Sequence, residues 1–315
     1  MVDDRLRLVR RNTVEIIEES ELEPLFKEKK HPVAYCGYET SGEVHLGHLV
    51  TITKLMDLME AGCKIKVLFA DWHTWLNQKG EWDFIHDQVK EWKAIFKKAG
   101  LKDAEFVLGS SFQRDLAYID DILKMSLKTT MKRALRSMQE VARDIEHAKV
   151  SQLIYPFMQI EDIKALKLDI AYAGIEQRKI HMLARELLPE LGWKAPLCIH
   201  TPLIPSIAKE GKMSSSDPES LISVKDSPES IRKKLNKAFC PEGVIKDNPV
   251  LAITGLIVFP RIDSLEVKRP EKFGGNLAFG SFDELSRSYE KKELHPQDLK
   301  KAVAEELISI LGPLR

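Results

Sequence analysis

The chain has 315 residues, which is enough for about two domains with substantial cores. Its 48 Lys and Arg residues balance 48 Asp and Glu residues, so the net charge neither indicates nor excludes a nucleic-acid partner. The four cysteines have no paired or zinc-type spacing, which indicates reduced core residues. The longest apolar run, Val250 to Pro260, is about half of the ~20 residues that a bilayer span needs. We therefore expect a cytoplasmic protein with no membrane segment.

The first hundred residues predict strands that alternate with helices. A helix is expected over 13–29, followed by an apolar strand over 33–37 and a helix over 45–60. Strands over 64–71 and 104–108 flank another helix over 82–99. Such alternation predicts an α/β fold with a parallel sheet covered on both faces.

The remainder of the chain predicts more helix than strand. Residues 115–146 have helical patterning throughout, which indicates an insertion over about 115–150, and the sheet resumes at 195–200 after a helix over 175–188. Helices are predicted over 227–239, 282–289 and 296–311. We therefore expect an α/β domain over 1–220 and a smaller, mainly α-helical domain over 221–315.

His45-Leu46-Gly47-His48 lies where the first strand gives way to a helix. A helix N-terminus offers unpaired N–H groups and about half a positive charge, Gly47 leaves the backbone open to a ligand, and His45 and His48 add donors. This arrangement predicts a phosphate site. A helix cap with two surface histidines explains the four residues equally well.

A second feature is the Gly-, Lys- and Ser-rich segment 209–218, which is typical of a mobile loop. Its Lys212 could supply a point charge to a phosphate, and Ser214 and Ser216 could donate hydrogen bonds. Taken alone, a segment of this composition is usually a solvated linker. After an α/β body that carries His-x-Gly-His, it favours the second half of a nucleotide site.

These two segments together resemble the signatures of the class I aminoacyl-tRNA synthetases, His-Ile-Gly-His and Lys-Met-Ser-Lys-Ser. The resemblance implies a Rossmann-like catalytic domain that uses ATP, with Mg²⁺, to activate an amino acid and passes it to a tRNA. It implies catalytic roles for His45, His48 and Lys212. The ATP-binding residues that it implies are Gly37, His45, Gly47, His48, Lys212, Met213, Ser214 and Ser216. This chain departs from the second signature at Ser215, where the family has lysine.

Three polar side chains of one predicted helix narrow the choice of amino acid. Tyr155, Gln159 and Asp162 have the spacing i, i+4, i+7, which places them on one face of an otherwise apolar helix. Buried polar groups need partners, so they form either an internal network or a site for a ligand with polar ends. The sequence alone leaves both interpretations open.

This helix and three further stretches resemble the tyrosyl-tRNA synthetases of archaeal and eukaryotic type. The stretches are Ala34 to Glu39, Ala70 to His73 and Glu176 to Met182. The resemblance implies that Tyr35 and Asp162 bind the phenolic hydroxyl of L-tyrosine, and that Tyr155, Gln159 and Gln177 hold its ammonium group. Leu68, Ala70, His73 and Gln113 are candidates for the ring pocket, although a purely structural role in the core explains them almost as well.

The resemblance also implies a homodimer, formed through the insertion, and contacts with tRNA(Tyr). For the acceptor end it implies Arg133, Arg136, Arg178 and Lys179. For the anticodon it implies Phe273, His295 and Asp298, since an aromatic ring can stack on a base and a carboxylate can accept from a guanine. Lys128, Lys132, Arg136 and Arg143 would form a basic stripe about 80° wide if the insertion were one helix, although most such stripes are solvated faces.

Three alternatives remain at this stage. A tryptophanyl-tRNA synthetase shares the fold and both signatures, but a pocket with Tyr35 and Asp162 suits a phenol better than an indole, which can only donate. A small-molecule nucleotidyltransferase has no need for the C-terminal helical domain. A non-catalytic, RNA-binding paralogue is disfavoured by the intact His45, Gly47, His48 and Lys212.

Overall fold

The computed structural model describes residues 2–139, 147, 149–208 and 220–315, which form two compact units. The first unit comprises Met1–Ser41 and Lys54–Pro202, and the second comprises Gly42–Thr53 and Leu203–Arg315. Helix α3 (Leu46–Glu60) contributes to both units. No described helix is long and apolar enough to cross a membrane.

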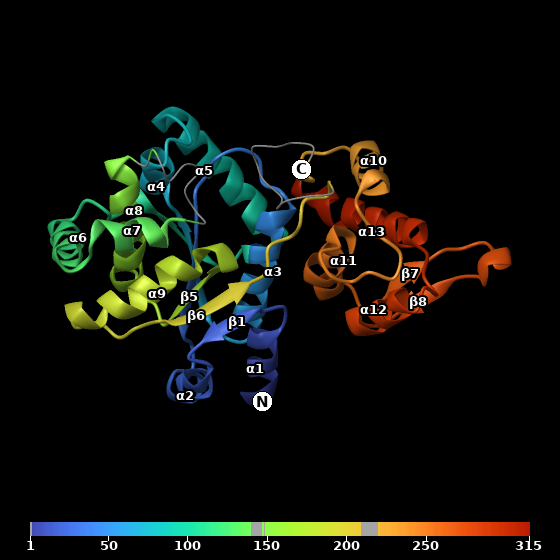
Figure 1. The fold of residues 1–315 in the computed structure, drawn as a ribbon, viewed down its shortest axis with the longest axis horizontal. Helices are drawn as coiled ribbons and strands as arrows, with labels where there is room; N and C mark the ends of the chain where they lie inside the picture. The colour runs from blue at the N-terminus through green and yellow to red at the C-terminus, as the bar shows by residue number, and fades with distance from the viewer. Residues whose placement is uncertain (1, 140–146, 148, 209–219) are drawn as a thin grey trace. The chain divides into compact units, whose positions relative to one another are not determined.

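The first unit is a twisted sheet with helices around it (Figure 1). Its strands are β1 (Glu15–Ile17), β2 (Val33–Tyr38), β3 (Lys64–Phe69), β4 (Glu105–Leu108), β5 (Ile170–Gly174) and β6 (Leu197–Thr201). Besides part of α3, its helices are α1 (Val2–Arg10), α2 (Leu22–Glu28), α4 (Asp71–Leu76), α5 (Trp82–Phe96), α6 (Leu116–Lys128), α7 (Met131–Ser137), α8 (Val150–Ala165) and α9 (Arg178–Leu187).

The sheet has the strand order β1-β6-β5-β2-β3-β4 and is parallel except for β1, which pairs antiparallel with β6. From β2 the chain proceeds to β3 and β4 on one side, and β5 and β6 lie on the other. The strand order therefore reverses between β2 and β5, where Tyr35 is in register with Ala171. Open α/β sheets bind ligands at the carboxyl ends of the strands beside such a switch point. The predicted parallel α/β fold is confirmed.

One predicted element near the amino terminus is wrong, and one central strand was not predicted. The helix predicted over 13–29 begins only at Leu22, because Glu15–Ile17 instead forms an edge strand against Cys198 to His200. Strand β5 was not predicted at all, although all five of its residues are buried. In both cases pairing with a neighbouring strand decides the conformation, and local periodicity does not report such pairing.

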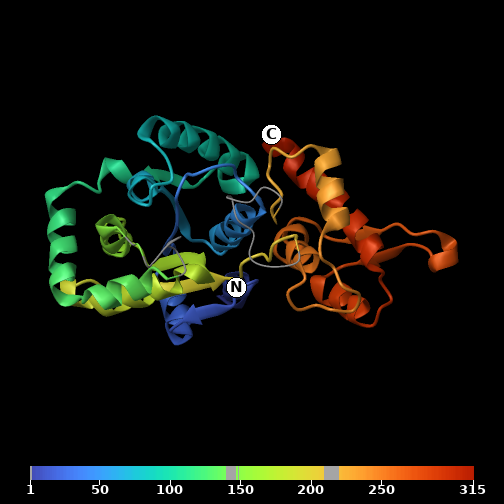
Figure 2. The same cartoon turned by 45° about the horizontal axis from the view of Figure 1, so that its top comes forward.

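The insertion is not one continuous helix. Helix α6 ends at Lys128, Thr129 is extended, and the Thr130 hydroxyl accepts from Arg133 N–H to cap α7. Lys128 therefore does not share a helix face with Lys132 and Arg136, and the predicted basic stripe is wrong. Arg143 lies outside the described residues. Helices α6 to α9 lie together in both views (Figures 1 and 2).

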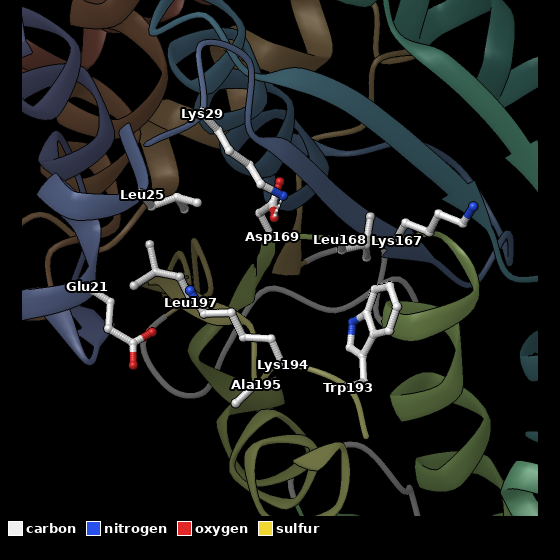
Figure 3. A pocket seen from close by; sticks show the side chains of 10 residues that line it. All are labelled: Glu21, Leu25, Lys29, Lys167, Leu168, Asp169, Trp193, Lys194, Ala195 and Leu197. Carbon is white, nitrogen blue, oxygen red and sulfur yellow. Dashed lines mark hydrogen bonds and ion pairs between the residues drawn. The ribbon is translucent and has the colours of Figure 1, made fainter. Parts of the chain in front are cut away.

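A pocket of about 380 Å³ lies at the amino ends of β5 and β6 (Figure 3). Lys29 on the segment after α2 reaches Asp169, which forms an ion pair with it at 2.6 Å and accepts from Val33 N–H at 2.9 Å. This carboxylate joins α2, β2 and β5. The pocket is at the amino ends of the strands, the edge of the sheet opposite to the one at which such folds bind ligands.

The second unit is mainly helical, as predicted. It contains α10 (Pro228–Lys237), α11 (Pro249–Ile253), α12 (Phe282–Glu290) and α13 (Pro296–Leu311), and the small antiparallel pair β7 (Leu265–Val267) and β8 (Leu277–Phe279), which was not predicted. The segment between β7 and β8 projects from the rest of this unit (Figure 1). Helices α10 and α13 begin as the sequence indicates, each with proline at its first position.

Candidate active site

A buried carboxylate organises the polar cluster of the first unit. Asp162, on α8, is 1% exposed, and its Oδ1 accepts from Gln113 Nε2 at 2.8 Å and from the Tyr118 hydroxyl at 2.8 Å. Gln113 follows β4, whereas Tyr118 belongs to α6. Two donors from neighbouring segments, the loop after β4 and the start of α6, therefore fix one carboxylate oxygen.

Tyr35 lies in β2, beside the switch point, and is 1% exposed. Burial raises the pKa of Tyr35 well above its usual value, and the nearby Asp162 carboxylate raises this pKa further. The Gln159 side chain acts in the opposite direction and lowers this pKa by hydrogen bonding. The structure thus brings Tyr35 and Asp162, which are far apart in sequence, into one polar cluster.

The charges in this cluster follow from burial. Burial raises the pKa of Asp162 to about 7, although hydrogen bonds from Gln113 and Tyr118 act in the opposite direction. Burial lowers the pKa of His73 to about 3, so its ring is neutral near pH 7. The approach of His73 Nε2 to Asp162 Oδ2, at 3.8 Å, is therefore not an ion pair.

The other predicted pocket residues lie next to this cluster. Tyr155 is buried on α8, and its ring meets the His73 ring edge-on at 4.6 Å between centroids. Gln159, one turn further along α8, donates from Nε2 to Gln177 Oε1 at 3.3 Å. The spacing of Tyr155, Gln159 and Asp162 is realised in a continuous helix.

Tyr118 is the residue that sequence reasoning missed. Its hydroxyl lies within 2.8 Å of both Asp162 Oδ1 and the Met158 carbonyl oxygen. In the sequence it is one of several residues on the buried face of an amphipathic helix, together with Ile122 and Met125. A buried tyrosine signals a hydrogen-bond partner but does not identify it.

Gly37 is an exposed position within β2. A Cβ atom there would lie 3.7 Å from the Tyr35 ring and 3.9 Å from Leu68, which are ordinary packing distances. Nothing within the first unit therefore requires glycine here. An open stretch of strand backbone remains consistent with the approach of a ligand.

In the second unit, the two histidine rings cap the start of α3. Gly47 N–H donates to His45 Nδ1 at 3.1 Å, and His45 N–H donates to His48 Nδ1 at 3.1 Å. Burial lowers the pKa of His45 to about 4, so the ring is neutral and carries its proton on Nε2. The cap and the phosphate site are therefore compatible, since capping uses Nδ1 and leaves an N–H donor on Nε2 of His45.

The structure gives a steric reason for glycine at position 47, which the sequence did not reveal. A Cβ atom at this position would lie 2.8 Å from His45 Cε1, so any side chain would displace the His45 ring. Glycine is therefore needed to keep His45 in its capping position. The openness of the backbone toward a nucleotide is a second use of the same residue.

Lys212, Met213, Ser214 and Ser216 lie outside the described residues. The chain just before and just after them is joined, because Ile207 N–H donates to the Ser220 carbonyl at 3.2 Å. A few residues later, Ser223 pairs with His45 in an antiparallel bridge, and Leu46 N–H donates to the Ile222 carbonyl at 3.1 Å. The chain that leaves the Lys-Ser-rich segment is thus bonded to the start of the His-x-Gly-His helix.

The predicted acceptor-end residues are largely held in pairs. Arg178 forms a bidentate ion pair with Glu15, and Arg133 pairs with Glu186. Lys179 Nζ donates to Gln139 Oε1 at 2.7 Å, while Arg136 is exposed. An RNA phosphate would have to compete with these acceptors.

The three predicted anticodon residues belong to two tethered segments. Phe273 is 60% exposed on the segment between β7 and β8. Arg269, on the same segment, donates to the Glu293 carbonyl at 2.9 Å, close in sequence to His295, whose Nδ1 caps α13. Asp298 lies in the first turn of that helix. The structure therefore brings the two predicted segments together.

Comparison with known proteins decides the family. Residues 27–312 match the family model of the class I tRNA synthetases for tryptophan and tyrosine. The chain is 50% identical to the tyrosine–tRNA ligase of Methanocaldococcus jannaschii, over 99% of each chain. It is 47% identical to that of Archaeoglobus fulgidus, over 100% of this chain and 97% of the relative.

This chain belongs to the class I tyrosyl-tRNA synthetases, archaeal type. The crystal structure of the Archaeoglobus fulgidus tyrosyl-tRNA synthetase complexed with L-tyrosine superposes with a TM-score of 0.98, at 48% identity, over 100% of this chain and 99% of that chain. A tryptophanyl-tRNA synthetase from Aeropyrum pernix, at 20% identity and a TM-score of 0.75, shares the fold. The predicted family is confirmed, and the tyrosyl branch is favoured over the tryptophanyl one.

Proposed function

We propose that this synthetase is a tyrosine–tRNA ligase that works through the cluster around Asp162. It would activate L-tyrosine with ATP to tyrosyl-adenylate and pyrophosphate, and then transfer the tyrosyl group to the 3′ end of tRNA(Tyr). The observation that carries the proposal is the buried pair of Tyr35 and Asp162, with one Asp162 oxygen already held by Gln113 and Tyr118.

The phenol of the substrate completes this cluster. A phenolic hydroxyl can donate to Asp162 and accept from the Tyr35 hydroxyl at the same time. Because Gln113 and Tyr118 both occupy Oδ1, we assign the phenol to Oδ2. Phenylalanine would leave both protein groups without a partner in a buried site, and such sites reject the analogue by orders of magnitude.

The other end of the amino acid would meet Tyr155, Gln159 and Gln177. The Gln159 to Gln177 contact is long, at 3.3 Å, so it is easily exchanged for a bond to an ammonium group. An ammonium group donates three hydrogen bonds, and the hydroxyl of Tyr155 and the two amide oxygens can accept them. This arrangement leaves the substrate carboxylate free to react.

We propose that ATP is bound by residues of the first strand, the His-x-Gly-His segment and the second signature. These residues are Gly37, His45, Gly47, His48, Lys212, Met213, Ser214 and Ser216. The tyrosine carboxylate oxygen attacks the α-phosphorus of ATP in line, the new C–O–P linkage forms, and pyrophosphate leaves. Neutral His45 donates from Nε2, and Lys212 supplies positive charge, so both stabilise the transferring phosphates without removing a proton.

Mg²⁺ would enter the site with ATP. The described residues contain no group of three or more His, Cys, Asp or Glu side chains that could hold a metal ion. We therefore assign the ion to the phosphate oxygens of ATP, which suit a hard cation. The chemistry that it supplies is neutralisation of phosphate charge.

We propose that tRNA(Tyr) contacts both domains: a catalytic domain over 1–220 binds its acceptor end, and an anticodon-binding domain over 221–315 binds its anticodon. Phe273 would stack on an anticodon base, and His295 and Asp298 would bind base edges. Arg133, Arg136, Arg178 and Lys179 would contact the acceptor end. The reaction is a cytoplasmic step of protein synthesis, and we propose that location.

We also propose a homodimer formed through α6. Leu116, Ile119, Leu123 and Leu127 follow one face of this helix and are 39% to 87% exposed. The opposite face, with Tyr118 and Ile122, is buried. A continuous apolar stripe of this kind marks a protein interface, and an identical helix of a second copy can cover it symmetrically.

The activity is tested by ATP–pyrophosphate exchange with tyrosine, tryptophan and phenylalanine supplied separately. We expect exchange that depends on tyrosine, because only the phenol satisfies both Tyr35 and Asp162. Exchange driven by tryptophan would favour the tryptophanyl alternative. A protein that binds tRNA but supports no exchange with any amino acid would be a non-catalytic paralogue and would refute the proposal.

Tyrosine affinity should depend on pH through Asp162. Since the pKa of Asp162 is about 7, the carboxylate that accepts from the phenol is lost as the pH falls through that value. The Kd for L-tyrosine, measured by calorimetry, should be constant above about pH 8 and rise by up to about tenfold per pH unit on the acidic side. Asp162→Asn should weaken binding and give a flat profile. The same acidic limb in Asp162→Asn would contradict the assignment.

The dimer is tested by light scattering after gel filtration. Leu123→Asp places a charge in the middle of the α6 stripe and should halve the molar mass from two chains to one. Val14→Asp, at another exposed aliphatic residue that is 53% exposed, serves as the control and should leave the mass unchanged. A wild-type protein that elutes as a monomer would show that α6 has a different role.

A further inference from the structure

An aromatic surface lies beside the polar cluster around Asp162, but its residues do not belong to that cluster. Trp75, on α4, is 39% exposed, although its indole stacks on Trp82 at 5.7 Å with an interplanar angle of 23°. Trp72 packs edge-on against Trp82 at 4.8 Å, and the Arg114 guanidinium lies over the Trp72 ring at 5.7 Å. The indole of Trp75 is thus supported by its neighbours while part of it remains open.

A hollow of about 500 Å³ adjoins Trp75. It is lined by Trp75, Leu76, Gln78, Gly80, Glu81 and Ser151. Phe84, which is 43% exposed, packs directly over Gly80. The Ser151 hydroxyl donates to the Leu76 carbonyl at 2.9 Å and so fixes α4 to the first turn of α8. The hollow therefore combines an aromatic wall with polar groups at its edge.

The two helices that line the hollow, α4 and α8, also contribute residues to the polar cluster around Asp162. Ser151 precedes Tyr155 by four residues, so the two side chains lie on one face of α8, one turn or about 6 Å apart along the axis. On α4, His73 contacts the Tyr155 ring, whereas Trp75, two residues later, projects from the other side of that helix. Through Ser151, the hollow therefore lies one turn of α8 from Tyr155, which is proposed to hold the ammonium group beside the carboxylate that reacts.

We propose that this hollow receives the unpaired 3′ end of the tRNA, with one of its last bases stacked on Trp75. The inference rests on the proposed function, because the terminal ribose must reach the carbonyl carbon of tyrosyl-adenylate, beside the ammonium group. Aromatic side chains stack on any base, which suits an end that all tRNAs share. This surface would serve the transfer step and not the activation step.

The surrounding groups fit a single strand that ends in C, C and A. Gln78, Glu81 and Ser151 line the hollow, and carboxylate, amide and hydroxyl oxygens accept from the exocyclic amines of cytosine and adenine. Arg114, whose guanidinium lies over the Trp72 ring, and Lys149, two residues before Ser151, are both exposed and would face the phosphates. Lys149 precedes the N-terminus of the 16-residue helix α8, which adds positive potential.

The experiment separates the two reaction steps. Trp75→Ala should lower kcat/KM for tRNA in aminoacylation by about tenfold or more, because a stacked base is lost. Tyrosine-dependent pyrophosphate exchange should stay within about twofold of wild type. Trp75→Phe retains an aromatic face and should recover most of the loss. Tyrosine-dependent exchange by the wild-type protein tests the proposed function. A loss of aminoacylation without a loss of exchange in Trp75→Ala tests whether the hollow binds the tRNA end.

Other outcomes would overturn the inference. An equal fall in exchange and aminoacylation would show that Trp75 supports the fold or the tyrosine cluster. Unchanged aminoacylation would show that no base stacks there, and a change of molar mass in light scattering would assign the surface to a contact between copies. Competition by a tRNA that lacks its unpaired 3′ nucleotides supplies a second readout, since its inhibition constant should be the same for wild type and Trp75→Ala.

Discussion

The arrangement of the site depends on one buried carboxylate. Asp162 is almost fully removed from solvent, which penalises its ionised form, and two hydrogen bonds to Oδ1 partly offset that penalty. The donors Gln113 and Tyr118 lie in the loop after β4 and in α6, so the carboxylate also fixes these two neighbouring segments relative to α8. A recognition group held in this way loses little freedom when the substrate binds.

The topology of the sheet determines which residues lie near this carboxylate. The strand order reverses between β2 and β5, which is where such folds bind ligands, and Tyr35 lies within β2 at this switch point. The helix α6 serves two purposes on opposite faces: Tyr118 points inward to Asp162, and the leucine stripe faces outward. If the stripe is the dimer interface, association of two copies would support the same helix that orients the carboxylate proposed to bind the phenol.

Much of the fold and of the candidate site could be predicted from the sequence, because the patterns that indicate them are local. Helical spacing placed Tyr155, Gln159 and Asp162 on one face, and alternating strands and helices predicted the parallel sheet. Non-local pairing could not be predicted: β1 and β5 exist because of their neighbours, and Tyr118 meets Asp162 across two helices. The reason for Gly47 was also hidden, because it depends on where the His45 ring lies. The roles of Lys212 and the neighbouring serines stay predictions.

We propose that the Oδ1 hydrogen bonds orient Asp162 so that Oδ2 selects a phenol. The most direct test is the ratio of kcat/KM for tyrosine to that for phenylalanine in pyrophosphate exchange, for wild type and Tyr118→Phe. Removal of one hydroxyl leaves the pocket shape intact but loosens the carboxylate, so the ratio should fall by about tenfold, mainly through a higher KM for tyrosine. An unchanged ratio, in a variant with wild-type thermal stability, would contradict the account.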